Sequence, residues 1–446
     1  MKQQLVFSIL AYFRFFAKLQ LLKNRPTIIG VTGSAGKTST RDAIYAAIKN
    51  DKRVKVSYKA NSESGIPLNI LGLSPAKFTL LEWLKLMLLC PVKLLTNWEK
   101  YSIYLVEMGI DGPNSPKNME YLLTIIQPDI GIILNAAPMH SQQFDYLVKA
   151  KDSAQRAQEI ITLIAKEKGK IVTSLNETQT AVINIDQQEL VNLQPLVRAK
   201  ILTFGKSNLS DIQILDYNIK DTHTIFSYKI GSKTQTLTFK NQLLPQHFAY
   251  TFAASIAVGR TLHISLSRII SNLEQDFKLP EGRSSFITGI NGSKIIDSSY
   301  NSSTKPALDM LDLLTVVPGK RKFAVLGDIR ELGAVSQLEH EAVAQKASEV
   351  CDAVLLIGPQ MKQFALPVVQ KIKTQAHWFK TAYQAADFLQ TQLKTDDIIL
   401  VKGSQNTLLL EIVVEQLMAQ PENAQKLLAR RGAFWDKKRA ELKDIS

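Results

Sequence analysis

Cysteine is scarce in this 446-residue chain, and its two copies form no recognisable pair. Cys90 and Cys351 lie far apart and at no metal-ligand spacing, which argues against a disulfide framework and against a zinc site. Zinc-finger spacings, basic-zipper heptads and aromatic RNA-binding signatures are missing too, so we expect no nucleic-acid partner. The composition fits a reducing cytosol.

Acidic residues are in the minority: 40 Asp and Glu stand against 54 Lys and Arg, which gives a formal net charge of +14. This surplus predicts attraction to an anionic partner, such as an acidic lipid surface or a phosphorylated substrate. The hydrophobic share of 45% is that of a globular protein. Because one hydrophobic core rarely organises so long a chain, we expect two or three domains.

Long hydrophobic runs are interrupted by charge. Residues 1–25 are strongly apolar, but Arg14 and Lys18 stand among them on one helical face. Such a segment is a poor membrane span and a better interfacial helix whose cations reach the lipid headgroups. Residues 78–100 have the same character and are broken at Pro91. The two segments predict peripheral contact with the inner face of a membrane; the alternative is that each helix packs on its own domain.

What the sequence does contain is an alternation of strand-like and helical stretches. The run "TIIGVTG" (27–33) is short, apolar and β-rich, and a helical pattern begins after it at Lys37. Residues 101–109 and 128–137 are further candidates for buried strands. This order predicts an α/β fold with a mostly parallel sheet covered by helices.

Beyond residue 150 the pattern continues and then restarts. After a polar helix over 150–170, the runs "KIVTSL" and "TAVINID" are expected to be strands. Short alternating runs between 200 and 240 predict antiparallel strands, and apolar runs after residue 284 predict a second, Rossmann-like α/β unit. We therefore divide the chain into a hydrophobic, basic amphipathic helix (1–25), a central phosphate-loop domain (26–284), a C-terminal domain (285–425) and a basic tail (426–446).

The segment "GVTGSAGKT" (30–38) approximates the phosphate-binding template G-x-x-x-x-G-K-[ST], with Gly30 or Gly33 in the part of the opening glycine. In such a loop, backbone N–H groups face the phosphates and the following helix adds its positive end. Lys37 would then reach the β- and γ-phosphates, and Thr38 would offer its hydroxyl to magnesium. With a strand before it and a helix after it, the motif predicts a nucleotide-binding site rather than a coincidental glycine turn.

Two further polar residues follow predicted strands. Glu107 comes directly after one strand and His140 shortly after the next, so both would project over the carboxyl edge of a parallel sheet, where ligands gather. Both are reasonable partners for magnesium, although imidazole is a minority ligand for so hard an ion. Taken singly, each also fits an ordinary strand-end charge or loop histidine.

Nine motifs in one order make the chain resemble the Mur ligase family, and most closely its MurF type, over residues 26–420. They are "TGSAGKTS", "NSESGIPLNILGL", "VEMG", "NAAPMH", "IAKEKGKIV", "LPEGRSS", "DSSYNSS", "GDIRELG" and "ILVKGSQNTLLLE". The resemblance implies a cytoplasmic, ATP- and Mg²⁺-dependent amide ligase of peptidoglycan precursor synthesis. Its substrates would be a UDP-linked muramoyl tripeptide and D-alanyl-D-alanine, joined through an acyl phosphate.

The resemblance also implies roles for single residues. ATP would be held by Gly33, Ser34, Ala35, Gly36, Lys37, Thr38, Ser39, Thr251, Arg283 and Asp297. Metal ions would be held by Thr38, Glu107, His140 and Lys168, of which Lys168 matches the lysine that such ligases carbamylate. The substrates would face Asn61, Ser62, Gly65, Tyr300, Asn301, Asp328, Glu331, Lys402, Gly403 and Ser404. Catalysis would fall to Lys37, His140, Lys168 and Arg283, the last as a bidentate cation on the transferring phosphate.

The chain departs from the family pattern in several places. The phosphate loop begins at residue 30, before which the family's uridine-binding domain has no room. We therefore expect UDP to be held differently, a partner to supply the contact, or a lipid-linked muropeptide to replace it. The family's His-Asn-x-x-Asn lacks both asparagines between His247 and Thr251, which bears on adenine selectivity. Gln405 stands where an arginine is common, and the stretch before Lys168 is longer than usual.

Two other functions compete with this interpretation. A Mur-like ligase acting on another carboxylate, such as folate or a polyamino acid, is disfavoured by the motifs "GDIRELG" and "DSSYNSS". A membrane-associated nucleotide-binding partner without catalysis is disfavoured because such a scaffold needs no metal-and-phosphate set. That set is Lys37, Glu107, His140, Lys168 and Arg283.

Overall fold

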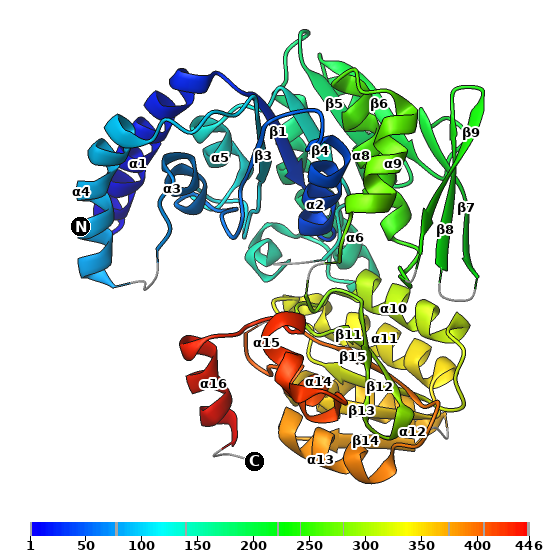
Figure 1. Ribbon diagram of the computed structural model, residues 1–446. Helices are drawn as coiled ribbons and strands as arrows, with labels where there is room; N and C mark the ends of the chain where they lie inside the picture. Colours follow the sequence, from blue (N-terminus) through cyan, green and yellow to red (C-terminus); the bar gives the residue numbers. More distant parts are fainter. Residues whose placement is uncertain are drawn as a thin grey trace.

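The structure is a computed structural model, and it describes residues 2–75, 79–138, 141–220, 223–240, 242–279, 281–372, 375–404 and 406–443. Two β-sheets, each covered by helices on both faces, lie one above the other (Figure 1). The strands of the first sheet end at Phe239, and those of the second begin at Ser285. The expected α/β architecture with two units is confirmed.

The first sheet has the strand order β2-β3-β1-β4-β5-β6-β7-β8-β9 among the described residues. Its first seven strands in this order run parallel, and β8 pairs antiparallel with β7 and β9. The alternating runs predict these two antiparallel pairs correctly, but β6, at the start of that stretch, is parallel to both its neighbours. The strands are β1 (Thr27–Thr32), β2 (Val54–Val56), β3 (Ile103–Glu107), β4 (Ile130–Ile133), β5 (Thr180–Asn184), β6 (Lys200–Gly205), β7 (Ile212–Lys220), β8 (His223–Ile230) and β9 (Lys233–Phe239).

Helices cover both faces of this sheet because its central strands alternate buried side chains between them. Ile29 and Val31 of β1 face one hydrophobic core, which α2 and α8 close, while Val106 of β3 faces the other. The helices are α1 (Lys2–Asn24), α2 (Lys37–Ile48), α3 (Gly65–Leu71), α4 (Leu80–Thr96), α5 (Met119–Ile125), α6 (Ser153–Thr173), α7 (Gln188–Val191), α8 (Phe248–Thr261) and α9 (Leu266–Asp276).

Helix α6 corrects one expectation. It continues to Thr173 and so includes most of "KIVTSL", which we expected to be a strand. Ile164 and Ile171 lie seven residues apart on the buried face of the helix, which packs on β4. Gly131 of β4 permits this approach, because a Cβ there would meet the Ile171 carbonyl oxygen at 2.6 Å. A β-branched pair fits a strand or a buried helix equally well, and packing decides between them.

Helix α4 corrects a second expectation, because it runs through Pro91 without a break. Proline cannot donate the hydrogen bond that the Met87 carbonyl would otherwise accept. The Tyr12 hydroxyl of α1 donates to this carbonyl at 3.0 Å instead. Between the two helices, Phe13 and Cys90 are fully buried. Helices α1 and α4 therefore pack as a pair, and α1 also packs on α3 and α5.

The second sheet has the strand order β10-β11-β15-β12-β13-β14, parallel except for β10. Helices α10, α11 and α12 cover one face, and α13 and α14 the other. The elements are β10 (Ser285–Thr288), β11 (Lys294–Ser298), α10 (Thr304–Val316), β12 (Lys322–Gly327), α11 (Ser336–Val350), β13 (Ala353–Ile357), α12 (Leu366–Lys371), β14 (Gln375–Phe379), α13 (Ala382–Gln392), β15 (Ile398–Lys402), α14 (Glu411–Leu417), α15 (Ala424–Leu427) and α16 (Ala433–Lys443).

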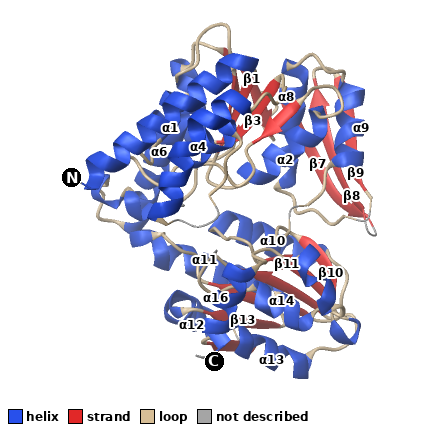
Figure 2. Cartoon of the chain, turned by 60° about the vertical axis from the view of Figure 1, so that its left-hand side comes forward, coloured by secondary structure: helices blue, strands red, loops and turns tan. Residues whose placement is uncertain are grey.

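Figure 2 shows the two units one above the other. They meet through the loops after β4 and β12. The Ser141 hydroxyl donates to the Leu332 carbonyl at 2.7 Å, and the Gln142 N–H donates to the Glu331 carbonyl at 3.3 Å. Both loops follow the carboxyl ends of parallel strands. The carboxyl edges of the two sheets consequently face a common space.

Candidate active site

That space is a cleft with a volume of about 1560 Å³ between the two units. Its walls include the phosphate loop, the loops after β3 and β4, the residues after β11, and Lys402 at the end of β15. Ligands of open α/β sheets bind at carboxyl strand ends, where the loops leave room for them. Carboxyl strand ends of both sheets therefore lie at this one cleft.

The phosphate loop is held in shape by its neighbours. Gly36 has a φ of 81°, a conformation that glycine adopts without strain, and α2 begins directly after it. The Ala35 N–H donates to the side-chain oxygen of Asn135 at 2.8 Å, and the Ser34 hydroxyl donates to the Ala137 carbonyl at 2.9 Å. Sequence reasoning missed Asn135, although its position directly after a buried strand is a usable signal.

Lys37 lies folded against its own loop, where its Nζ donates to the Gly33 carbonyl at 2.8 Å. Burial lowers the pKa of Lys37, Glu107 opposes this shift and Arg283 reinforces it. A half-buried cation with carbonyl partners can exchange them for phosphate oxygens, which are stronger acceptors. The loop is thus built to receive an anion.

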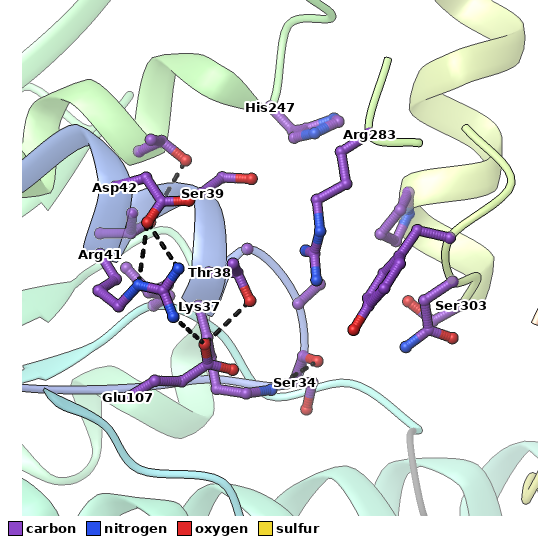
Figure 3. A pocket seen from close by; sticks show the side chains of 18 of the residues that line it. Ser34, Lys37, Thr38, Ser39, Arg41, Asp42, Glu107, His247, Arg283 and Ser303 are labelled. Carbon is purple, nitrogen blue, oxygen red and sulfur yellow. Dashed lines mark hydrogen bonds and ion pairs between the residues drawn. The ribbon is translucent and has the colours of Figure 1, made fainter. Parts of the chain in front are cut away.

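Thr38 and Glu107 meet at the floor of the cleft (Figure 3). The Thr38 hydroxyl donates to Oε2 of Glu107 at 2.9 Å, and the Asn61 amide lies 3.4 Å from Oε1. Glu107 is only 6% exposed, and Arg41 Nη1 lies 3.7 Å from its carboxylate. Hydroxyl, amide and carboxylate oxygens are the donors that magnesium prefers, so this group fits such an ion. We missed Arg41, which stands one helical turn beyond Lys37.

Lys168 lies in the buried part of α6 and is 3% exposed. Burial holds the pKa of Lys168 well below its usual range, and the charge of Lys37 acts in the same direction. Its neighbours differ: Lys166 is exposed, and Lys170 pairs with Glu167 at 2.8 Å. Of the three lysines in "AKEKGK", Lys168 is therefore the one held toward its neutral form.

Arg283 reaches into the cleft from the segment between the two sheets (Figure 3). Its guanidinium lies 4.5 Å from the centre of the Tyr300 ring, and Arg430 lies 5.1 Å from the same ring. Arg430 is held in turn by an ion pair of 2.9 Å with the buried Glu411. Two cations on one aromatic ring make this wall of the cleft basic. Sequence reasoning missed Arg430, which it assigned to a basic tail.

Lys402 ends β15 and lines the same wall. Its Nζ donates to the Asn301 carbonyl at 2.8 Å and lies 3.3 Å from the Ser298 hydroxyl. Burial lowers the pKa of Lys402 to about 7, and Arg283 contributes to this shift. Asp297 is fully buried, and its Oδ2 has no hydrogen-bond partner among the described residues.

A histidine and an aspartate connect the two units across the cleft. His247 Nδ1, just before α8, lies 3.3 Å from Oδ2 of Asp309 on α10. Although burial opposes it, contact with His247 and Lys305 holds the pKa of Asp309 below its usual value. Nearby, the Thr251 hydroxyl accepts a hydrogen bond of 3.3 Å from Thr40. Asp309 was not identified from the sequence.

The structure brings together most residues that the sequence singles out. The cleft is lined by Ser34, Ala35, Gly36, Lys37, Thr38, Ser39, Asn61, Ser62, Glu107, Thr251, Arg283, Tyr300, Asn301 and Lys402. The residues outside its lining are Gly33, Gly65, Lys168, Asp297, Asp328, Glu331, Gly403 and Ser404. His140 and Gln405 lie outside the residues that the structure describes.

Asp328 and Glu331 have structural partners instead. The Asp328 carboxylate accepts the Met361 N–H at 2.8 Å, and the Glu331 carbonyl belongs to the contact between the two units. Ser404 is tied to the same region, since its N–H donates to the Asp328 carbonyl at 3.1 Å. These residues stand behind the cleft wall rather than on it.

Fold and site together define a class: a phosphate-loop α/β protein whose nucleotide-binding edge faces a second α/β unit rich in cations. Residues 31–259 match the Mur ligase middle domain, and residues 282–405 match the Mur ligase, glutamate ligase domain. The chain belongs to the Mur ligase family.

Several curated relatives carry one name, UDP-N-acetylmuramoyl-tripeptide–D-alanyl-D-alanine ligase. The protein from Rickettsia prowazekii is 25% identical over 410 residues, which span 90% of this chain and 81% of that protein. The protein from Synechocystis is 27% identical over 88% of this chain and 75% of its own length. The protein from Bacillus subtilis is 26% identical, with shares of 91% and 79%.

Solved structures of this type have the same fold. A MurF ligase from Thermotoga maritima in complex with ADP superposes with a TM-score of 0.72 at 25% identity, covering 91% of this chain and 83% of that one. A MurF from Acinetobacter baumannii superposes with a TM-score of 0.73 at 19% identity, covering 91% and 79%.

Proposed function

We propose that the chain is an ATP-dependent amide ligase that adds D-alanyl-D-alanine to a UDP-linked muramoyl tripeptide in peptidoglycan precursor synthesis. The observation that carries this proposal is the shared cleft: a phosphate loop on one unit shares it with Arg283 from the connecting segment and with Lys402 of the other unit. The names of the relatives and the ADP complex of the Thermotoga maritima ligase support the same reaction. We assign the reaction to the cytoplasm, where ATP is available.

ATP would bind with its phosphates on the loop of residues 33–39 and its γ-phosphate toward Arg283. We infer that Thr38 and Glu107 hold a magnesium ion, since their oxygens lie together at the floor of the cleft. When bound, magnesium withdraws charge from the phosphoryl oxygens and favours their displacement. Lys37 and Arg283 would neutralise the remaining charge on the phosphoryl group in transfer.

The chemistry follows from the weakness of a carboxylate as an electrophile. A carboxylate oxygen of the tripeptide attacks the γ-phosphorus, the bond to the bridging oxygen breaks, and ADP leaves an acyl phosphate behind. The dipeptide amine then attacks the acyl carbon, and the tetrahedral intermediate expels phosphate to form the amide. The amine must lose protons in this step, and we assign one of them to Lys402, whose pKa of about 7 suits a proton acceptor.

Lys168 would act through a modification. A neutral amine adds to carbon dioxide, forming an N–C bond and releasing one proton, and the product is a carbamate with two carboxylate-like oxygens. Burial that keeps Lys168 neutral favours this reaction. We propose that the carbamate, with His140, holds a second magnesium ion.

Closure of the second unit over the cleft would complete the site. We propose that this movement brings Asp297 toward the nucleotide, and Asp328, Glu331 and the turn Gly403–Ser404 toward the incoming dipeptide. Closure also excludes water, which would otherwise hydrolyse the acyl phosphate.

The decisive experiment measures ADP and phosphate release by the purified protein with magnesium, UDP-muramoyl tripeptide and D-alanyl-D-alanine. We expect release that requires both the tripeptide and the dipeptide, and its loss in Lys37→Ala. Folate with glutamate serves as the control pair for a ligase of different substrate. Absence of amine-dependent turnover with every muropeptide, lipid-linked ones included, would refute the proposed reaction.

A further inference from the structure

Helix α4 presents a row of large apolar side chains to solvent. Leu81, Leu84, Leu88, Val92 and Leu95 follow each other at intervals of three or four residues, which places them on one side of the helix. Leu81, Leu88 and Leu95 are 79%, 75% and 72% exposed. Contiguous exposed apolar surface on this scale marks a contact with something outside the chain.

Helix α1, which packs on α4, also exposes large apolar side chains. It runs beside α4, and the Tyr12 hydroxyl and the Lys23 ammonium donate hydrogen bonds to the Met87 and Leu94 carbonyls of that helix (Figure 1). Phe15 and Leu22 of α1 are 58% and 61% exposed. The α1–α4 surface is defined here as Phe15, Leu22, Leu81, Leu84, Leu88, Val92 and Leu95.

These exposed residues are not needed for packing within the chain. The opposite sides of both helices already bury Phe13, Leu86 and Cys90, which form a core together with Leu68 of α3. The helix pair therefore has an apolar inner face and an apolar outer face, which is unusual for a helix at the surface of a soluble domain.

Charge around the surface has one dominant sign. In the sequences of the two helices, six basic residues stand against one acidic residue, Glu82. Lys18 and Lys85 are exposed, and Glu99 just beyond α4 is engaged in an ion pair with Lys55. The basic residues are Lys2, Arg14, Lys18, Lys23, Lys85 and Lys93.

Trp98 follows the end of α4 with 63% of its surface exposed. Its Nε1 donates to the Leu95 carbonyl at 2.8 Å, and Lys23 Nζ lies 4.2 Å from the centre of its ring. A tryptophan beside a lysine at the rim of an apolar surface is the arrangement that anchors proteins at the boundary between headgroups and acyl chains.

We propose that the α1–α4 surface docks on an anionic lipid bilayer, with its leucines among the upper acyl chains and its lysines at the headgroups. The apolar row supplies area for burial, and the basic residues supply attraction to acidic lipid. A second copy of this chain is a poorer occupant, because a two-fold contact would bring the same surplus of positive charge from both sides together.

Insertion of α1 across the membrane is a different arrangement. The segment Gln4–Asn24 is long and apolar enough for a span by length and composition, with a mean hydropathy of 1.6. In the structure, however, Arg14 donates to the Thr124 hydroxyl at 2.7 Å and lies over the Tyr121 ring, and Phe13 is fully buried. Docking keeps these contacts, whereas insertion would break them.

Docking would also bring one end of the cleft close to the lipid. Helix α3 begins at Gly65, directly after the cleft residues Asn61 to Glu63, and packs on α1. A substrate bound at this end would lie near the bilayer surface. This consequence depends on the proposed function, whereas docking itself does not.

Flotation with lipid vesicles tests the proposal without any measurement of activity. The full chain is mixed with vesicles of equal parts phosphatidylglycerol and phosphatidylcholine, or of phosphatidylcholine alone. We expect the protein to float with the anionic vesicles and to be released from them by high salt. Binding should shift the tryptophan fluorescence to the blue, and this shift should be lost in Trp98→Phe. The variant Leu81→Gln/Leu88→Gln/Leu95→Gln should bind the anionic vesicles about tenfold more weakly, because it loses apolar area. The variant Lys18→Gln/Lys85→Gln should also bind them about tenfold more weakly, because it loses attraction to acidic lipid.

A matched control replaces three exposed leucines elsewhere. Leu196→Gln/Leu209→Gln/Leu215→Gln changes side chains that are 63%, 81% and 45% exposed and should float like the unaltered protein. Equal loss of flotation in both triple variants would overturn the proposal, as would flotation that is indifferent to lipid charge. Retention on vesicles after an alkaline carbonate wash would replace docking by insertion of α1. A dimer that the first triple variant abolishes, without vesicle binding, would assign the surface to a second copy.

Discussion

The Thr38 hydroxyl donates a 2.9 Å hydrogen bond to the Glu107 carboxylate, although 69 positions of sequence separate the two residues. Parallel pairing of β1 with β3 produces this contact, because Glu107 is the last residue of β3 and Thr38 lies in the first turn of α2, which follows the carboxyl end of the neighbouring strand β1. Two oxygen groups at one strand edge, beside the phosphate loop, are what a magnesium-nucleotide complex requires.

Loss of one of these oxygens should weaken catalysis. We expect Thr38→Val to lower kcat/KM by about 100-fold and to raise the magnesium concentration needed for half-maximal activity. Thr38→Ser retains the hydroxyl and should stay close to the unaltered enzyme. Steady-state rates across a magnesium titration measure both effects, and a Thr38→Val enzyme with unchanged magnesium dependence would contradict the assignment.

Lys168 should be essential through its modification rather than its charge. We expect Lys168→Ala to lower turnover by about 100-fold, with part of the activity restored by a short carboxylic acid that replaces the missing carbamate. The unaltered enzyme should lose activity in buffer depleted of carbon dioxide. Lys166→Ala, which removes an exposed lysine two residues away, is the matched control and should remain active.

Lys402 predicts how stability depends on pH. Its pKa is about 7 in the folded protein and about 10.4 in an unfolded chain. Between these values the unfolded chain binds more protons, so stability should rise as pH increases through this window. Below it, the buried charge destabilises the fold in full. Lys402→Met removes this buried charge, so the thermal midpoint of the variant should exceed that of the unaltered protein near pH 6. The difference between the two midpoints should disappear by about pH 10. If the thermal midpoints of the two proteins changed with pH in the same way, Lys402 would not titrate in this range.

The ion pair between Arg430 and Glu411 should matter for stability, because both side chains are almost fully buried. Arg430→Met leaves the Glu411 charge without its partner and should lower the free energy of unfolding by about 3–5 kcal/mol. Arg430→Met/Glu411→Leu should recover most of this loss. Lys438→Met breaks a pair whose side chains are half exposed, and its cost should stay below about 1 kcal/mol. Denaturant unfolding of the three variants gives the comparison, and equal losses in the two single variants would contradict it.

Tyr12 and Pro91 should be coupled. Tyr12→Phe leaves the Met87 carbonyl without its donor and should cost about 1 kcal/mol of stability. In a Pro91→Ala background the restored N–H supplies a helical donor, so the same tyrosine substitution should cost clearly less. A double-mutant cycle measured by denaturant unfolding tests this, and strict additivity would mean that the hydroxyl does not replace the missing donor.

Local patterns predicted the larger elements correctly because each has a strong signal of its own. The run before Gly33 reads as a strand, and the helix after Gly36 begins where the motif predicts. The same reasoning missed β2, β10 and β14, which are short and gain stability from neighbouring strands rather than from their own composition. It also predicted a strand at "KIVTSL", whereas most of this stretch belongs to α6, which packs closely on Gly131.

The chemistry of the site divides in a similar way. Sequence alone determined the phosphate loop, a carboxylate at the end of a strand, and the order of motifs that marks the family, because these features depend on residue type and spacing. That carboxylate, Glu107, was expected just beyond the strand and is its last residue. Tertiary structure decided that Lys168 rather than Lys166 is buried, that Tyr300 lies between Arg283 and Arg430, and that Tyr12 compensates for Pro91. Burial and contact between distant segments arise only when the elements pack, and pKa values, ion pairs and exposed surfaces depend on that packing.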